Sequence, residues 1–351
     1  DIKYLDPTLI LWRSSSQWIG GLFFLFFLII IFSNKSFNYK MTNLTYSGDY
    51  NLHSENNIKD NLLKIFIIYS ILSIVILSLL NLSGVRLFNS LNLSMTLVSG
   101  GGFLPTENLS KIISTNFQKI ILIFSFFASL LNFYLLLNLF NKNTLVKEHK
   151  EDLYLIILSI IFCFFIFFNN YDGLDIIISI TSSLANSGLT LIEDNNLSLY
   201  FLLITIIGGS LISNTSGIKL TRFYVLLKIT SLEIIKLISP NSIINKTIFG
   251  SDKKISDDHV KISFLIFISF FLSLFILSSL LVVDNIGFEK SFKLSILTLT
   301  NTVNSEMYNM QNLDFNNLLT SSKISLILFM IIGKIELISV FLIFKKILFR
   351  D

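Results

Sequence analysis

Three short polar turns each follow an apolar stretch that is too short to cross a membrane. Such a turn exposes backbone carbonyls, and glycine permits the backbone angles that aim them inward. Rings of carbonyls replace the hydration shell of a cation such as potassium. One turn alone also fits an ordinary extracellular loop, so the repetition strengthens the interpretation. The turns are Ser99-Gly100-Gly101-Gly102, Asn186-Ser187-Gly188-Leu189 and Thr302-Val303-Asn304-Ser305.

A polar break interrupts the apolar run that begins at Tyr200. A helix in lipid satisfies its own backbone polar groups, so a break at this depth is tolerated only against protein or a water-filled cavity. The sequence therefore predicts that the break lines a pathway, and the alternative is a loop between two short helices. The residues that define it are Gly208, Gly209, Ser210, Ser213, Asn214, Thr215, Ser216, Gly217 and Lys219.

One lysine lies deep within the last apolar stretch. Lys334 is about ten residues into it, and an ionisable group at that depth faces the bundle interior, a partner or water. Glu336 is two residues further on and points elsewhere on a helix, which disfavours a direct pair. We expect Lys334 near an ion pathway, where its charge opposes cations. Lys219 and Arg222 fit snorkelling side chains at helix ends, and for Arg222 this interpretation is favoured.

The composition indicates an integral membrane protein surrounded by lipid. Of the 351 residues, 52% are hydrophobic and 14% are charged, and the mean hydropathy is +0.72. The net charge of +4 is too small to suggest nucleic acid as a partner. The sequence shows neither a Cys/His metal cluster nor a nucleophile, base or ligand set, so an enzyme and a covalently bound cofactor are both disfavoured.

The candidate residues recur in a repeated pattern of spanning helix, short re-entrant helix and returning helix. The predicted fold is all-α, with parallel repeats around an axis along the membrane normal. We expect the second helix of a first repeat at residues 1–34, and complete repeats at residues 61–141, 152–228 and 262–349. The expected spanning helices are residues 12–32, 62–82, 117–140, 153–168, 200–227, 262–283 and 324–344, and the short helices are residues 84–98, 174–185 and 292–300.

Each short helix directs the negative end of its dipole toward its turn. Three turns that converge on one axis, with a fourth from outside this chain, would form a four-fold cation filter with potassium as its substrate.

Basic residues favour one side of the predicted bundle. Residues 35–60, 141–152, 228–261 and 345–351 hold three, three, six and three Lys or Arg, whereas residues 169–200 on the turn side hold none. The positive-inside rule places the basic loops in the cytoplasm and the turns outside. We therefore expect a multi-pass protein of the cell's inner (plasma) membrane.

Motifs spread over nearly the whole chain resemble one known family. They are Leu11-Trp12-Arg13-Ser14 with Gln17-Trp18-Ile19-Gly20-Gly21, Ser99-Gly100-Gly101-Gly102-Phe103, Asn132-Phe133, Asn186-Ser187-Gly188-Leu189, Gly208-Gly209 with Ser213, Gly217-Ile218-Lys219 and Arg222, Pro240, and Lys323 with Met330 and Gly333-Lys334-Ile335-Glu336. This set resembles the TrkH/KtrB/HKT superfamily of potassium uptake proteins, with TrkH the nearest in pattern.

The resemblance implies four helix–pore–helix repeats in a pseudo-four-fold, channel-like subunit that forms a homodimer. It implies a cytoplasmic nucleotide-binding regulatory subunit (TrkA/KtrA-like) and makes Na⁺ and H⁺ candidates for a coupling ion. It also implies that residues 209–217 are non-helical and form an intramembrane gate beneath the filter.

Several positions depart from the family pattern. The first filter and its helix are expected before Asp1 and are absent from this sequence. Val303 replaces a glycine and resists a positive φ. Asn214 and Ser216 replace a threonine and a glycine, and Lys334 replaces an arginine. These departures support an alternative: a degenerate or split subunit that assembles with another chain and does not conduct alone.

Overall fold

The computed structural model describes residues 5–33, 55–133, 135–136, 150–167, 171–192, 195–239, 247–248, 254–302, 306–310, 315 and 318–335. Within these ranges, three helices are long and apolar enough to cross a membrane. They are α1 (Pro7–Ser33), α3 (Glu55–Leu82) and α12 (Asp257–Val283). At about 1.5 Å per residue, helices of this length exceed the roughly 30 Å hydrocarbon core. The chain is an all-α membrane protein, as its composition predicts.

The remaining elements follow the predicted repeating order. After α1, one unit contains α3, α4 (Leu87–Val98) and α5 (Asn116–Leu130), the next contains α8 (Lys150–Ile166), α9 (Gly173–Leu184), α10 (Ser198–Ile206) and α11 (Leu220–Ile238), and the last contains α12, α13 (Phe288–Leu299) and α14 (Thr320–Ile335). Short 3₁₀ turns occur at Leu109–Lys111, Asn195–Leu197 and Glu306–Tyr308. The strands β1 (Ile207–Gly208) and β2 (Ile218–Lys219) form one parallel pair.

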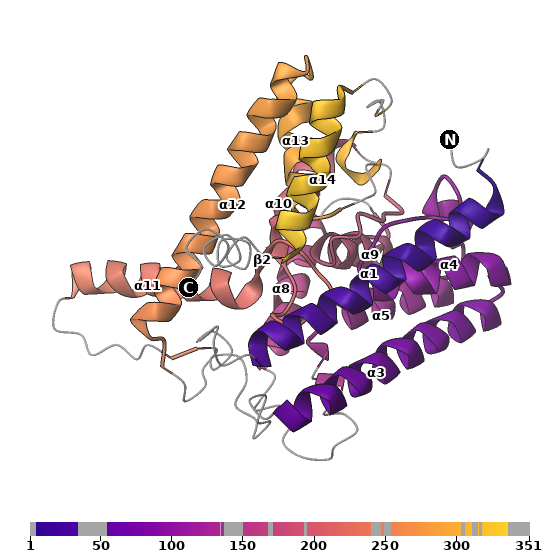
Figure 1. Cartoon of the computed structure of the whole chain (residues 1–351), viewed down its shortest axis with the longest axis horizontal. Helices are drawn as coiled ribbons and strands as arrows, with labels where there is room; N and C mark the ends of the chain where they lie inside the picture. The colour runs from indigo at the N-terminus through magenta and orange to yellow at the C-terminus, as the bar shows by residue number, and fades with distance from the viewer. Residues whose placement is uncertain are drawn as a thin grey trace.

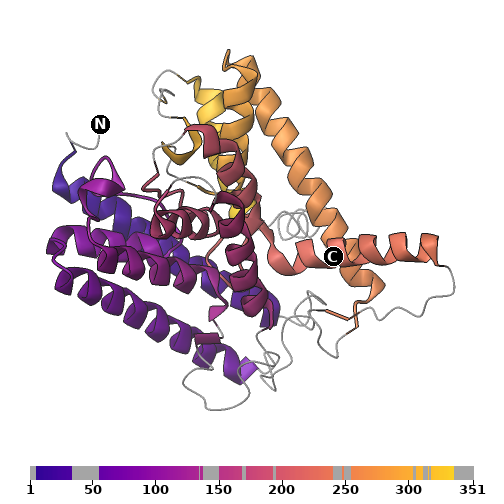
Figure 2. The same ribbon diagram turned by 180° about the vertical axis from the view of Figure 1, so that it is seen from behind.

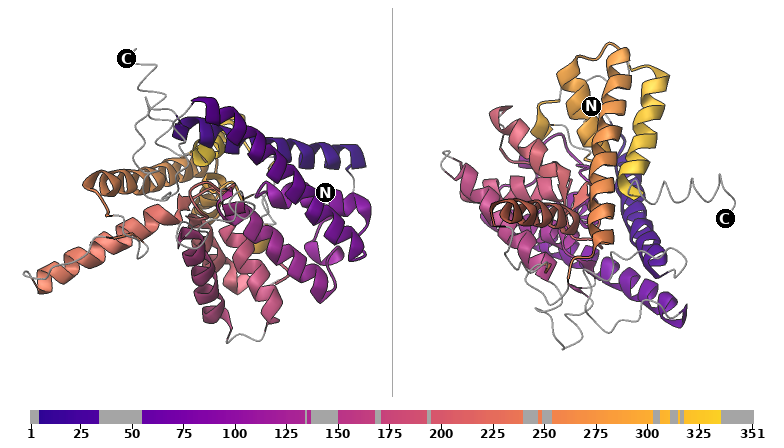
Figure 3. Two further views of the ribbon diagram at one scale, coloured as in Figure 1. Left: turned by 90° about the horizontal axis from the view of Figure 1, so that it is seen from below. Right: turned by 90° about the vertical axis from the view of Figure 1, so that its left-hand side faces the viewer.

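The units lie side by side around a common centre. In Figure 1, α1, α3, α4 and α5 form one group, α12, α13 and α14 stand on the opposite side, and α8, α9 and α10 lie between them. The view from behind shows the same order in reverse (Figure 2). The helix α11 packs against α12 and then extends away from the body (Figure 3). The short helix of each unit packs against longer helices: α4 against α1 and α3, α9 against α5 and α8, and α13 against α12 and α14.

The three short helices share one length and one manner of starting. Each of α4, α9 and α13 has 12 residues, or about 18 Å, which is too short to span the hydrocarbon core. The residue before each helix has a similar extended backbone conformation. The φ and ψ angles are −57° and 138° at Arg86, −59° and 130° at Asp172, and −54° and 142° at Gly287. The prediction of a short helix in every unit is confirmed.

Two predicted helix ends differ from the structure. The helix α5 ends at Leu130, although the apolar sequence predicts that it continues to residue 140. Residues 131 and 132 are not helical, because the backbone on either side of them bonds to a neighbouring loop: the amide of Phe133 donates to the carbonyl of Ile212, and the carbonyl of Leu130 accepts from the amide of Ser210, both at 3.0 Å. The helix α11 continues to Ile238, past the predicted end at residue 227, because its apolar residues recur at helical spacing beyond Lys228.

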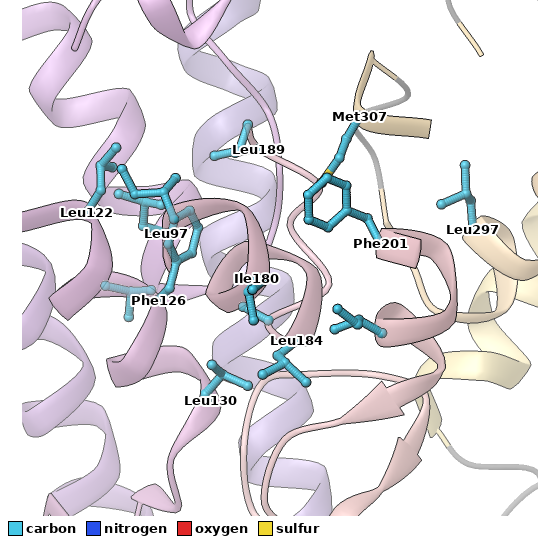
Figure 4. Close-up of a cluster of buried hydrophobic side chains, with 14 of the residues drawn as sticks. Leu97, Leu122, Phe126, Leu130, Ile180, Leu184, Leu189, Phe201, Leu297 and Met307 are labelled. Carbon is cyan, nitrogen blue, oxygen red and sulfur yellow. The ribbon is translucent and has the colours of Figure 1, made fainter. Parts of the chain in front are cut away.

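One buried apolar cluster includes a leucine near the carboxyl end of each short helix. Figure 4 shows Leu97 of α4, Leu184 of α9 and Leu297 of α13, with Phe126 of α5 and Met307 near them. All five side chains are buried. Because an interior packs at close to crystal density, these contacts fix the positions of the turns that follow the helices.

Candidate functional site

The same backbone turn ends all three short helices. In each, a residue with positive φ follows the cap: Gly100 (66°), Asn186 (58°) and Asn301 (54°). The next amide donates to the carbonyl five residues earlier, which is the Schellman arrangement. These bonds join Gly101 to Thr96 at 2.8 Å, Ser187 to Ser182 at 3.0 Å, and Thr302 to Leu297 at 2.9 Å.

This hydrogen-bond pattern fixes how the turns correspond. Counting from the shared bond, Gly188 is equivalent to Gly102 and to the position of Val303. Gly188 has φ of 70°, a conformation that a β-branched residue resists. The amide of Leu189 then donates to the hydroxyl of Ser182 at 2.7 Å, which ties the α9 turn (residues 186–189) back to its helix. The predicted filter residues Val303, Asn304 and Ser305 lie outside the described residues.

The predicted break in the third returning helix is present. The helix α10 ends at Ile206, α11 begins at Leu220, and residues 209–217, called the buried loop below, are neither helix nor strand. The pairing of β1 with β2 closes the neck of the loop. Its polar side chains are buried in protein: Ser210, Ser213, Asn214, Thr215 and Ser216 are each at most 2% exposed. Protein therefore surrounds this irregular backbone, as the bilayer requires.

Glycine is required at the neck because two backbones meet there. A Cβ on Gly208 would lie 2.1 Å from the carbonyl oxygen of Ser216, and one on Gly209 would lie 2.6 Å from that of Leu130. Gly217 has φ of 75°, which favours glycine. The amide of Ser210 donates to the carbonyl of Leu130 at 3.0 Å. The loop thus packs directly on the interrupted end of α5.

Lys219 is enclosed by the loop that precedes it. Its side chain is 1% exposed, and its ammonium donates to the carbonyls of Thr215 at 2.7 Å and Ser213 at 3.3 Å. It also lies 3.1 Å from the hydroxyl of Ser213 and 3.2 Å from that of Thr215. A snorkelling lysine would extend its ammonium to the membrane surface, whereas the ammonium of Lys219 binds oxygen atoms of the buried loop.

The buried loop lies against two of the turns. The side-chain amide of Asn214 donates to the carbonyl of Val98, the last residue of α4, at 2.9 Å. The backbone amide of Ser216 donates to the side-chain oxygen of Asn186 in the α9 turn at 3.0 Å. A Cβ on Gly100 would lie 3.3 Å from the carbonyl oxygen of Asn214 and 3.5 Å from that of Ala185. The α4 and α9 turns therefore meet directly over the loop.

Lys334 reaches the same point from α14. Its ammonium donates to the backbone carbonyl of Asn214 and lies 4.8 Å from the ring centroid of Phe24 in α1. Gly333 lets α14 approach α13 closely, because a Cβ there would lie 2.1 Å from the carbonyl oxygen of Leu299. The lysine thus faces the interior, at the loop. Glu336 lies outside the described residues.

Two buried carboxylates were missed by the sequence reasoning. Glu151 and Asp152 begin α8 and are 5% and 2% exposed. Glu151 accepts a hydrogen bond from the hydroxyl of Thr221 in α11, and Asp152 accepts one from the amide of Asn132 at 2.9 Å. The signal was an acidic pair at the start of an apolar stretch, but adjacent lysines made it resemble a solvated loop.

The snorkelling interpretation of Arg222 is wrong. Its side chain is 0% exposed, as is that of Thr221 beside it. The helix α11 starts inside the protein, directly after the buried loop, so protein encloses the guanidinium in the first turn of the helix. Arg222 is therefore an interior residue, buried with Thr221 in the first turn of α11.

Comparison with known proteins supports the fold. No family model matches the chain. An uncharacterized cation transporter of Methanocaldococcus jannaschii is 25% identical over 379 aligned residues, which cover 100% of this chain and 73% of that protein. The crystal structure of the potassium transporter TrkH from Vibrio parahaemolyticus matches with a TM-score of 0.84 and 18% identity, covering 97% of this chain and 73% of that one. This chain therefore has the TrkH fold, as the resemblance of its motifs predicts.

Proposed function

We propose that this chain is the ion-translocating membrane subunit of a potassium uptake system. The proposal is supported by the two relatives, one named a cation transporter and the other a potassium transporter. Both names describe transport proteins, which agrees with a transporter and disfavours an enzyme. The ion moves through a filter of backbone carbonyls, and the buried loop acts as the gate beneath it.

The observation that carries the proposal is the Schellman turn that ends α4, α9 and α13. Three helices of equal length end in the same turn, and two of these turns meet over one buried loop. The carboxyl end of each helix carries partial negative charge, which favours a cation at the turns. Carbonyls held this way coordinate a dehydrated potassium ion without a charged ligand.

The buried loop and Lys334 together oppose passage in the conformation described. The loop packs on the α4 and α9 turns, and the ammonium of Lys334 binds the carbonyl of Asn214 within it. A cation that leaves the filter therefore meets both a steric obstacle and a positive charge. Conduction requires the loop to move, and Na⁺ or H⁺ are the candidates for a coupling ion.

The assembly proposed for this subunit follows from its fold and charge. We propose a homodimer in the plasma membrane, with a cytoplasmic nucleotide-binding regulatory subunit that controls the loop. The basic segments support an orientation with the turns outside and the long loops in the cytoplasm.

Uptake in a host that lacks its own potassium transporters tests the proposal. The complete gene is expected to restore growth at low potassium and to drive rubidium uptake. Membrane insertion is verified separately by protease accessibility of a tagged loop. Normal insertion without any uptake would contradict the proposal and favour the alternative, a non-conducting subunit that assembles with another chain.

A further inference from the structure

We propose that Asn186 couples the filter to the gate, because its single carboxamide holds both the last turn of α10 and the end of the buried loop to the α9 turn. The roles of filter and gate rest on the proposed function, whereas the two hydrogen bonds of Asn186 are features of the structure. It makes Asn186 a positioning residue, one that sets how tightly the loop is held under the turn.

The geometry of the carboxamide is specific. Its nitrogen donates to the carbonyl of Thr205 at 2.8 Å, and its oxygen accepts from the backbone amide of Ser216 at 3.0 Å. Thr205 lies in the last turn of α10, just before the loop, and Ser216 lies at the end of the loop. One side chain thus bridges the two points where the chain enters and leaves the break.

Both backbone groups need this partner because the helix is broken. In a continuous helix the carbonyl of Thr205 would accept from the amide of Gly209. That amide instead donates to the hydroxyl of Thr215 at 2.8 Å. Thr205, Ser216 and Asn186 are at most 2% exposed, so these backbone groups are shielded from bulk water. The carboxamide satisfies a terminal carbonyl of α10 and a buried amide of the loop.

The other units show what is particular to this linkage. Asn301 is the equivalent residue of the α13 turn, and its side-chain nitrogen donates to the carbonyl of Met330 at 2.9 Å. Met330 lies three residues before Gly333, as Thr205 lies three before Gly208, but α14 continues as an unbroken helix through this region. In the α4 turn the equivalent residue is Gly100, and the carbonyl of Asn214 lies close to the place of its absent side chain.

The consequence is a link between loop position and turn geometry. The loop cannot move away without breaking a bond to Asn186 or pulling on the α9 turn. A buried polar group left without a partner is costly, so the bonds favour the closed loop. Ions that bind the turn and a regulator that moves the loop should therefore influence each other, as linkage requires.

Asn186→Gly tests this without disturbing the backbone. Asparagine and glycine both tolerate the positive φ at this position, so the substitution removes the carboxamide alone. Asn301→Gly is the matched control, because it removes the equivalent carboxamide from a turn that holds an unbroken helix. Both are made in the complete protein, reconstituted in lipid vesicles without a regulatory subunit.

Two measurements separate the inference from the proposed function. Hydrogen exchange of residues 209–217 should be at least about tenfold faster in Asn186→Gly and unchanged in Asn301→Gly. Rubidium influx should rise about tenfold in Asn186→Gly. Equal exchange in both variants would overturn the inference, even if transport is normal. Faster loop exchange in Asn186→Gly alone, with no transport by any form, would support the linkage and refute the proposed function instead.

Discussion

Replacing Lys219 by methionine should release the buried loop. Methionine keeps much of the side-chain volume but cannot donate hydrogen bonds. The substitution removes an ammonium that lies between 2.7 and 3.3 Å from the backbone and side-chain oxygens of Ser213 and Thr215. The loop would then enclose these oxygens without the charge around which it folds.

The free-energy change of the closed loop follows from the loss of hydrogen bonds to two buried carbonyls, those of Ser213 and Thr215. Each buried acceptor left without a partner costs about 1–3 kcal/mol, so the closed loop loses about 2–6 kcal/mol. An open loop exposes the same carbonyls to water and escapes this cost, so the difference acts on the equilibrium between closed and open forms. At about 1.4 kcal/mol per tenfold, even the lower value shifts this equilibrium by roughly thirtyfold.

Rubidium influx into vesicles without a regulatory subunit measures the shift. Lys219→Met should give influx that is at least tenfold higher than the unmodified protein. Lys236→Met is the control, because that lysine lies on α11, the helix that begins directly after Lys219, with its side chain 41% exposed and paired with Glu233 at the surface. Unchanged influx in a correctly inserted Lys219→Met protein would refute the claim that the ammonium holds the gate closed.

Two further substitutions act on α14. Lys334→Met should raise potassium influx by roughly tenfold, because a unit charge ~10 Å from the ion at an effective dielectric constant of ~20 raises the energy of the ion by about 1.7 kcal/mol. Lys334→Arg keeps the charge and should leave influx low. Equal influx in both variants would count against an electrostatic barrier. Gly333→Val should prevent stable folding, since its Cβ would lie 2.1 Å from the carbonyl oxygen of Leu299. Gly20→Val is the control, because no atom lies within 4 Å of its Cβ. Thermal unfolding in detergent compares the two variants, and equal melting temperatures would contradict the close packing at Gly333.

The repeat pattern was predictable because membrane physics constrains it strongly. A spanning stretch needs about 20 apolar residues, and the stretch at residues 87–98 is visibly too short. The break near Gly208 was also predictable, because glycine, serine and threonine interrupt an otherwise continuous apolar run. Both signals come from composition along the chain, and both survive in the structure.

Features that depend on tertiary contact were not predictable. Nothing in the apolar sequence after Leu130 ends α5, since the end is set by hydrogen bonds to the buried loop. Arg222 looked like a surface residue because the sequence does not show that α11 starts inside the protein. The acidic pair of Glu151 and Asp152 was missed for the same reason, as its partners Thr221 and Asn132 are distant in sequence.

The ion preference of the reconstituted protein shows whether the turns after the short helices form a potassium filter. Gly188→Ala places a Cβ on a residue with φ of 70°, whereas Gly173→Ala changes the start of the same helix, where no atom lies within 4 Å of the new Cβ. We expect rubidium and potassium influx to exceed sodium influx in the unmodified protein and in Gly173→Ala, and Gly188→Ala to abolish this preference. The same preference in all three proteins would contradict the assignment of these turns as the filter.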